Sequence, residues 1–100
     1  MYMYGTIFHM KPKSGQEEEI RKLFEEWNRD RKPKVQGASD GYLFKLEKGG
    51  LMGVAVFDSK ENYLANAEDP EQNQWFRKLR EHLEEDPQWN DGEILSSTTN

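Results

Sequence analysis

The 100-residue sequence contains no cysteine, which removes several kinds of chemistry at once. Without thiols there is no disulfide framework, no thiolate nucleophile and no thiolate metal site. The chain also lacks long hydrophobic runs. Its N-terminus has no basic segment followed by the about 7 to 15 apolar residues of a secretory signal, and no segment reaches the roughly 20 apolar residues of a membrane span. We therefore expect a soluble, cytoplasmic protein.

Positive charge is also scarce. The chain has 14 Lys and Arg residues against 19 Asp and Glu residues, a net charge of −5, and its basic residues are not gathered into one tract. Such a surface is a poor partner for nucleic acid or an anionic membrane. Aromatic residues make up 12% of the chain, too many for a disordered protein. At this length we expect a single domain over residues 1–96, followed by a polar tail at 97–100.

The N-terminal segment predicts a strand that is covered on both faces. In Tyr2–Lys11, apolar residues occupy both odd and even positions, so neither side of the strand is suited to water. Ser14 and Glu17 have the spacing of a capping box, which predicts that a helix starts there. The helix would bury the stripe that repeats at intervals of three and four residues: Ile20, Leu23, Phe24 and Trp27.

Two β-rich runs, Gly41–Glu47 and Leu51–Phe57, are separated by a glycine pair that predicts a hairpin. If Gly49-Gly50 is a two-residue loop, the large residues of the first strand face small residues or Phe57 of the second. The pairs would be Leu46 with Gly53, Phe44 with Ala55, and Tyr42 with Phe57. The second strand is apolar on both sides, so we expect it inside the sheet and the first strand nearer an edge.

A second helical region, from Lys60 to about Glu85, is interrupted by Pro70. Asp69 can cap a new helix in which Pro70 takes the first position, and Gln72 stands where the reciprocal capping partner belongs. The second piece would bury the stripe Trp75, Phe76, Leu79 and Leu83. Asp86-Pro87 should then stop the helix, Asn90-Asp91-Gly92 should form a turn, and Glu93–Ser96 should form a last short strand.

The predicted order is β-α-β-β-α-β, which folds most economically as a ferredoxin-like α+β domain. Its four-stranded antiparallel sheet carries both helices on one face. Two helices cover only that face, yet the first and third strands are apolar on both. A second copy of the same sheet is the expected cover for the other face, which predicts a homodimer joined through its sheet faces.

Three stretches of the sequence resemble the antibiotic biosynthesis monooxygenase family of the dimeric α+β barrel superfamily. They are HMKPKSGQEEEIRKLFEEW, FDSKENYLANAEDPEQNQWFRKLREHL and the closing DPQWNDGEIL. The resemblance covers residues 2–95 and is carried by helix boundaries and core aromatic residues. It implies a ferredoxin-like homodimer that forms a dimeric α+β barrel.

Some members of this family oxidise aromatic polyketides without metal or flavin, and others degrade haem. The haem degraders use an Asn on the first strand together with a Trp and a His further along. Here that strand carries Thr6, Phe8 and His9, and no Asn precedes Asn28, so the chain departs from the haem-degrading pattern. The resemblance therefore implies a cofactor-free monooxygenase acting on a small aromatic or polyketide-like substrate. The alternative is a non-catalytic dimeric barrel that binds a small hydrophobic ligand or has a structural role.

Four residues are candidates for the site of either activity. His9 could act as a general base at a cavity mouth, because a neutral imidazole accepts protons near pH 7. Tyr63, Asn66 and Trp75 lie around the helix break and could bind the substrate, with Trp75 stacking on an aromatic ring. The plainer alternatives stay open, namely a hydrogen-bonded histidine in a strand and a tryptophan in the core. No metal is expected, because consecutive carboxylates on a helix point about 100° apart.

Overall fold

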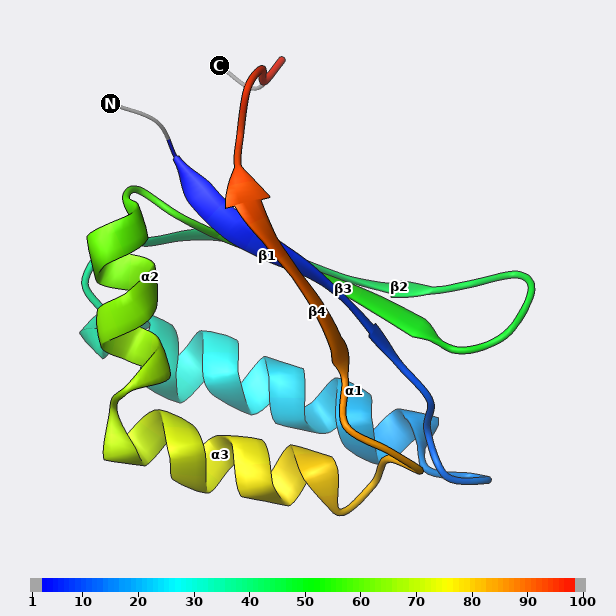
Figure 1. Cartoon of the computed structure of the whole chain (residues 1–100). Coiled ribbons are helices and arrows are strands. Elements are labelled where there is room, and N and C mark those ends of the chain that lie inside the picture. The colour runs from blue at the N-terminus through cyan, green and yellow to red at the C-terminus, as the bar shows by residue number, and fades with distance from the viewer. Residues whose placement is uncertain (1–2, 99–100) are drawn as a thin grey trace.

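A four-stranded antiparallel sheet carries the helices on one face in the computed structural model of the chain, which describes residues 3–98 (Figure 1). The sheet order is β2-β3-β1-β4. This is the ferredoxin-like α+β arrangement that the sequence predicts, although Tyr2 of the predicted first strand lies outside the described residues. The elements are β1 (Tyr4–Met10), α1 (Glu17–Glu26), the π-helical turn η1 (Trp27–Arg31), the 3-10 turn η2 (Lys32–Lys34), β2 (Ala38–Lys45), β3 (Leu51–Phe57), α2 (Lys60–Ala67), α3 (Pro70–Arg80) and β4 (Gln88–Glu93).

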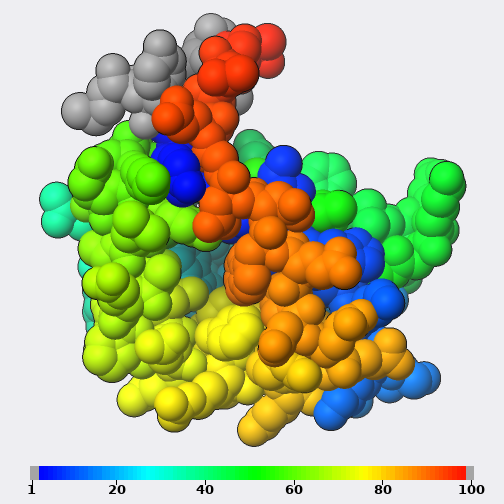
Figure 2. Space-filling view, in the orientation of Figure 1, coloured from blue at the N-terminus to red at the C-terminus, as the bar shows by residue number. Residues whose placement is uncertain are grey.

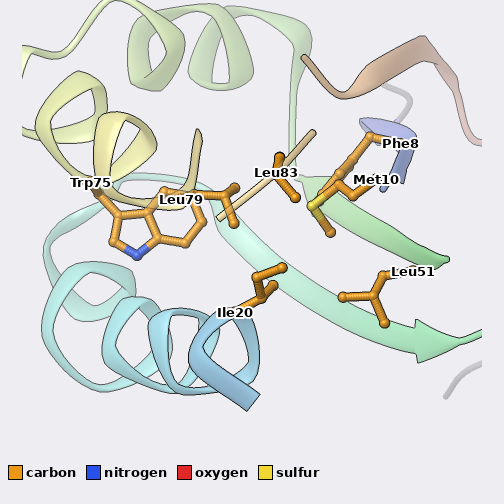
Figure 3. Close-up of a cluster of buried hydrophobic side chains, with 7 residues drawn as sticks. All are labelled: Phe8, Met10, Ile20, Leu51, Trp75, Leu79 and Leu83. Atoms are coloured by element: carbon orange, nitrogen blue, oxygen red, sulfur yellow. The ribbon is translucent and has the colours of Figure 1, made fainter. Parts of the chain in front are cut away.

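The hydrophobic core lies between the sheet and the pair α1 and α3 (Figure 3). Ile20 of α1 and Leu83, just after α3, are completely buried. The other buried members come from the sheet and α3: Phe8, Met10, Leu51, Trp75 and Leu79. Their side chains point toward one another from the sheet and from the helices. Each element therefore turns its apolar face inward, as the helical and strand periodicities predict. No helix among residues 3–98 is long and apolar enough to cross a membrane.

The two middle strands have two different apolar faces. Thr6, Phe8 and Met10 of β1 are buried on the side of the helices, while Ile7 between them is 50% exposed on the other side. Strand β3 repeats this alternation, because Ala55 pairs with Thr6 and Gly53 with Phe8. The sequence prediction that these strands are apolar on both sides is confirmed.

The register of the β2–β3 hairpin differs from the prediction. Leu43 pairs with Gly53, and Lys45 pairs with Leu51, so the two strands are joined by five residues, 46–50. Gly49 and Gly50 both have positive φ, 105° and 82°, and the loop is closed by bonds from Gly49 N to Leu46 O (3.0 Å) and from Leu46 N to Gly50 O (3.1 Å). The predicted two-residue loop is therefore wrong, and the pairing of the two strands is shifted by three residues.

A shift by an odd number of residues moves every β2 side chain to the other face of the sheet, so Tyr42 and Phe44 point away from the helices.

Two further boundaries differ from the predictions. Helix α1 starts at Glu17 with Gln16 as its N-cap and no side-chain cap, so Ser14 does not form the predicted capping box. The chain turns at Gly15, where φ is 77°, and this turn places Ser14 outside the helix. At the other end, Asn90-Asp91-Gly92 is not a turn but the middle of β4, because the free edge of β1 pairs with it along its length.

The break in the second helical region is confirmed. Asp69 caps α3, with its Oδ1 accepting a hydrogen bond from Glu71 N at 2.9 Å. Gln72 does not form the reciprocal cap, because its Oε1 instead accepts from Trp27 Nε1 at 2.7 Å. The Asp69-Pro70 break lets α2 and α3 run in different directions (Figure 1).

Replacing Asp69 with Ala should lower the free energy of unfolding by about 1 kcal/mol, because a first-turn N–H loses its acceptor and a negative charge leaves the helix N-terminus. Urea unfolding measures the change. Asp69→Asn should retain most of the stability, since Asn caps nearly as well as Asp. Equal midpoints for the wild type and Asp69→Ala would contradict the cap.

Candidate ligand-binding hollow

The surface is hollowed between α2, α3 and β4, where deeper parts of the molecule are visible (Figure 2). Three residues form one row across neighbouring strands, Ala55, Thr6 and Asp91. The hydrogen bond from Tyr63 to Asp91 places this row next to α2. All three lie on the face that carries the helices. Ala55 is partly exposed although it belongs to a middle strand. We call this region the sheet–helix hollow.

The hollow exists because the middle of the sheet carries small side chains there and because the helical cover is interrupted. Phe8 fills the adjacent position, since its ring lies over Gly53, where a Cβ would collide with it. Thr6 and Ala55 are too short to fill the next position. Helix α2 has only eight residues before the break, and α3 leaves in another direction. Proline at the first position of α3 is compatible with such a change of direction.

Tyr63 of α2 and Asp91 of β4 are joined by a hydrogen bond that spans the two layers. The Tyr63 hydroxyl donates to Asp91 Oδ1 at 2.9 Å, and its ring packs against Tyr4 and Phe57 with centroids 5.3 and 5.6 Å away. Burial, aided by the hydrogen bond to Asp91 and its charge, raises the pKa of Tyr63 to about 12. The phenol therefore keeps its proton at neutral pH and acts as a hydrogen-bond donor.

Thr6 supplies an unsatisfied polar group beside this pair. It is 5% exposed, and its Oγ1 makes no hydrogen bond of ordinary distance and angle. The hydroxyl is nevertheless close enough to the Tyr63 hydroxyl for a weak hydrogen bond, which opposes the rise of the phenol pKa. A buried hydroxyl without a partner costs about 1–3 kcal/mol. A ligand oxygen or a water molecule at this point would satisfy it.

Aromatic rings border the hollow on the β4 side. Trp89 lies 4.8 Å from the Phe8 ring and 6.0 Å from the Phe76 ring, measured between centroids. Trp89 is nevertheless 48% exposed, so part of the indole remains available for contact. Small-molecule sites usually combine apolar and aromatic surface with a few polar groups, as this region does.

A buried arginine holds the helix break in place. Arg31 of η1 is 8% exposed and donates from Nη1 to Glu71 Oε2 at 2.8 Å and from Nη2 to Asn66 Oδ1 at 3.0 Å. These two acceptors belong to the end of α2 and the start of α3. Arg31 thereby fixes the helix that carries Tyr63, while the Arg31 Nε remains buried without a partner.

The structure brings only part of the predicted site together. Tyr63 borders the sheet–helix hollow, and Asn66 lies one turn further along α2 with its amide oxygen engaged by Arg31. Trp75 is buried in the core, donates from Nε1 to Leu23 O at 2.9 Å, and packs edge-on against Phe24. Its accessible edge borders a separate shallow depression between α1 and α3 that is lined mostly by charged side chains.

His9 lies on the opposite face of the sheet. It pairs with Met52 and Gln88, and its neighbours Phe8 and Met10 are the residues that face the helices. Its imidazole borders Gly50, where a Cβ would come within 2.8 Å of Nε2. The expectation that His9 shares one cavity with Tyr63, Asn66 and Trp75 is therefore not met, because odd and even positions of a strand point to opposite faces.

Thr6 and Asp91 were missed by the sequence prediction. Asp91 was assigned to a turn, and Thr6 was considered only for the absence of an Asn. The alternation of β1 contains a usable signal, because Thr6 is the one small polar residue on the strand face shared with Tyr4, Phe8 and Met10. Within residues 3–98, no group of three or more His, Cys, Asp or Glu side chains could hold a metal ion.

The raised pKa of Tyr63 predicts a late step in the titration of the tyrosines. Because the phenol ionises near pH 12 in the folded chain and near pH 10 when unfolded, Tyr63 stabilises the fold below about pH 10 and loses this contribution as the pH approaches 12. Tyrosinate absorbance should show this step. Tyr63→Phe should remove it and Tyr42→Phe should leave it in place. A titration unchanged by Tyr63→Phe would contradict the assignment.

Comparisons with known proteins agree on the fold. No protein-family model and no curated protein sequence matches the chain. Solved structures do match. One is the "Putative antibiotic biosynthesis monooxygenase from Nitrosomonas europaea", with a TM-score of 0.81 and 14% identity over 98% of this chain and 95% of that one. A Bordetella bronchiseptica protein of the same name has a TM-score of 0.82 and 14% identity over 96% and 100% of the two chains.

A third structure, from Jannaschia sp. CCS1, is named as a dimeric ferredoxin-like protein of unknown function. It matches with a TM-score of 0.77 and 14% identity over 92% of this chain and 99% of that one. At such low identity these matches establish the fold and leave the activity open. The chain has the fold of the structures named as antibiotic biosynthesis monooxygenases.

Proposed function

We propose that the chain forms a homodimer that binds a small aromatic, polyketide-like molecule in the sheet–helix hollow of each subunit and oxidises it as a cofactor-free monooxygenase. The observation that carries the proposal is the buried Thr6 hydroxyl, which has no partner and lies beside the Tyr63–Asp91 pair. The names of the structural neighbours support the reaction class by analogy only.

The reaction needs a substrate with an acidic methylene next to its aromatic system. Asp91 would accept a proton from this carbon, and the Thr6 hydroxyl would donate to the oxygen on which negative charge develops. Tyr63, whose one hydroxyl proton is donated to Asp91, would hold that carboxylate in position. The carbanion then reduces dioxygen. One oxygen atom becomes the new carbonyl oxygen, and the other leaves as water with the two methylene hydrogens, so the substrate supplies all four electrons.

This assignment replaces the roles first expected for His9 and Asn66. His9 points to the other face of the sheet, and the Asn66 amide oxygen already accepts from Arg31. Trp75 would support the hollow from the core through its packing on Phe24. Trp89, half-exposed and backed by Phe8, is the better placed ring for stacking on an aromatic ligand.

The homodimer is supported by the outer face of the sheet. Three large side chains there are about half exposed, namely Ile7 (50%), Tyr42 (56%) and Phe44 (53%). They surround the partly exposed apolar residues of β3, which are Met52, Val54 and Val56. A second copy would cover this face, and one structural neighbour is named as a dimer. His9 lies on the same face, so it would belong to the interface.

Light scattering at micromolar concentration should give twice the 11.8 kDa mass of one chain. Val54→Glu should shift the mass toward the monomer, because it places a charge in the middle of the apolar face. Gln74→Glu on the exposed surface of α3 adds the same charge and should leave the dimer intact. A wild-type monomer at this concentration would contradict the proposal.

A non-catalytic ligand-binding protein is the second candidate. The observation that favours it is the protonation of Tyr63, because a phenol with a pKa of about 12 is a hydrogen-bond donor at neutral pH and not a base. Such a site can hold a ligand oxygen without changing it. Oxygen consumption separates the two candidates.

The probe 1,8-dihydroxyanthrone has both the acidic methylene and the hydroxyl groups that the reaction needs. Uptake of one O₂ per molecule above the rate without protein supports the monooxygenase, and binding without uptake supports the second candidate. Thr6→Val should weaken binding about fivefold while raising the free energy of unfolding by about 1 kcal/mol, because an unsatisfied buried hydroxyl is removed. Thr6→Ser should retain most of the affinity. Absence of both binding and uptake would overturn the proposed function.

A further inference from the structure

Two carboxylates of β4 stand at the mouth of the sheet–helix hollow. Asp91 pairs with Thr6 and Glu93 pairs with Tyr4, so both occupy the strand positions on the helix-bearing face. Strand β4 is an edge strand whose residues are all exposed. A molecule that enters beside β4 therefore meets negative charge before it reaches the buried Thr6 hydroxyl.

The charge of Asp91 is not neutralised by an ion pair among residues 3–98. The Tyr63 phenol that donates to it is uncharged. Lys60 lies one turn before Tyr63, but its Nζ stands 5.7 Å above the Tyr4 ring, toward the end of the sheet where Glu93 lies. The nearest partner of Asp91 thus supplies a hydrogen bond and no positive charge.

We infer that Asp91 is a specificity-determining residue that admits uncharged, hydroxyl-bearing aromatic ligands to the hollow and rejects aromatic carboxylates. This inference rests on the proposed function, because it concerns the same hollow. A ligand hydroxyl can donate to Asp91 through the free positions of its carboxylate, and such a charge-assisted hydrogen bond is stronger than a neutral one. A ligand carboxylate has no proton to donate and is repelled by a like charge a few Å away.

The chemistry of the three polar groups agrees with this selection. Asp91 only accepts hydrogen bonds, whereas Thr6 can donate or accept. A ligand with a hydroxyl group beside a carbonyl can donate to Asp91 and accept from Thr6 at the same time. An aromatic acid could accept from Thr6, but its charge would then lie beside the Asp91 carboxylate, and like charges a few Å apart repel each other even where water reaches them.

Two probes of similar size and shape test the inference, 1-naphthol and 1-naphthoate. Calorimetric titration of the full chain at pH 7.5 should show naphthol binding at least about tenfold more tightly than naphthoate. Asp91→Asn should improve naphthoate binding about tenfold and weaken naphthol binding about threefold, since an amide oxygen is a weaker acceptor than a carboxylate. Circular dichroism verifies that the variant is folded.

Glu61→Gln is the matched control, because Glu61 is exposed on α2 and its replacement changes the net charge by the same amount. It should leave the preference for naphthol unchanged. Naphthol that fails to bind would refute the proposed function itself. Equal binding of naphthol and naphthoate to the wild type would overturn the selectivity alone. An equal gain in naphthoate affinity in Glu61→Gln and Asp91→Asn would show that overall charge, and not Asp91, controls entry.

Discussion

The packing of Phe8 over Gly53 is the contact on which the interior of this protein depends. A side chain at Gly53 would collide with the ring, so glycine allows Phe8 to lie against the sheet. The ring then packs against Phe24 of α1, 6.1 Å away and nearly parallel, and against Trp89 of β4. This layer seals the end of the core that contains Met10 and Leu51. The next pair along the strands is Thr6 and Ala55, whose side chains are much smaller than Phe8, and the hollow begins there.

Because side chains alternate in direction along β1 and β3, the two faces of the sheet have different functions. Even positions of β1 and odd positions of β3 meet the helices and surround the hollow. The opposite positions, represented by Ile7 and Val54, form the face assigned to the second copy. Ligand contacts and association therefore use different side chains of the same two strands. A substitution on one face can change one of these two properties and leave the other intact.

Local sequence signals predicted much of the fold, whereas the pairing of residues across the sheet could not be predicted. The Asp69-Pro70 break and the apolar stripe of α1 depend on residues within one or two turns, and both were predicted. The hairpin register depends on the left-handed backbone of two consecutive glycines, and their sequence is equally compatible with a shorter loop. Asn90-Asp91-Gly92 has the composition of a turn, yet β1 offers it an unpaired edge and backbone pairing prevails. The site residue Asp91 was lost with that strand.

Long-range polar contacts were equally invisible in the sequence. Arg31 follows α1 in a polar stretch of the sequence, and its partners Asn66 and Glu71 lie 35 and 40 residues away. Periodicity cannot connect such groups, because they are far apart in the sequence and meet only in the folded chain. Tyr63 was identified from its place near the break, but its partner on β4 required the fold.

If the ligand enters between the sheet and the helices, the side chains of β3 can show it directly. Ala55 faces the helices, whereas its neighbours Val54 and Val56 face the other side. Nuclear Overhauser effects between bound 1-naphthol and assigned methyl groups report which side the ring occupies. We expect effects to the methyl groups of Ala55 and Thr6 and none to Val54 or Val56. Effects to the valine methyl groups without any to Ala55 would contradict it.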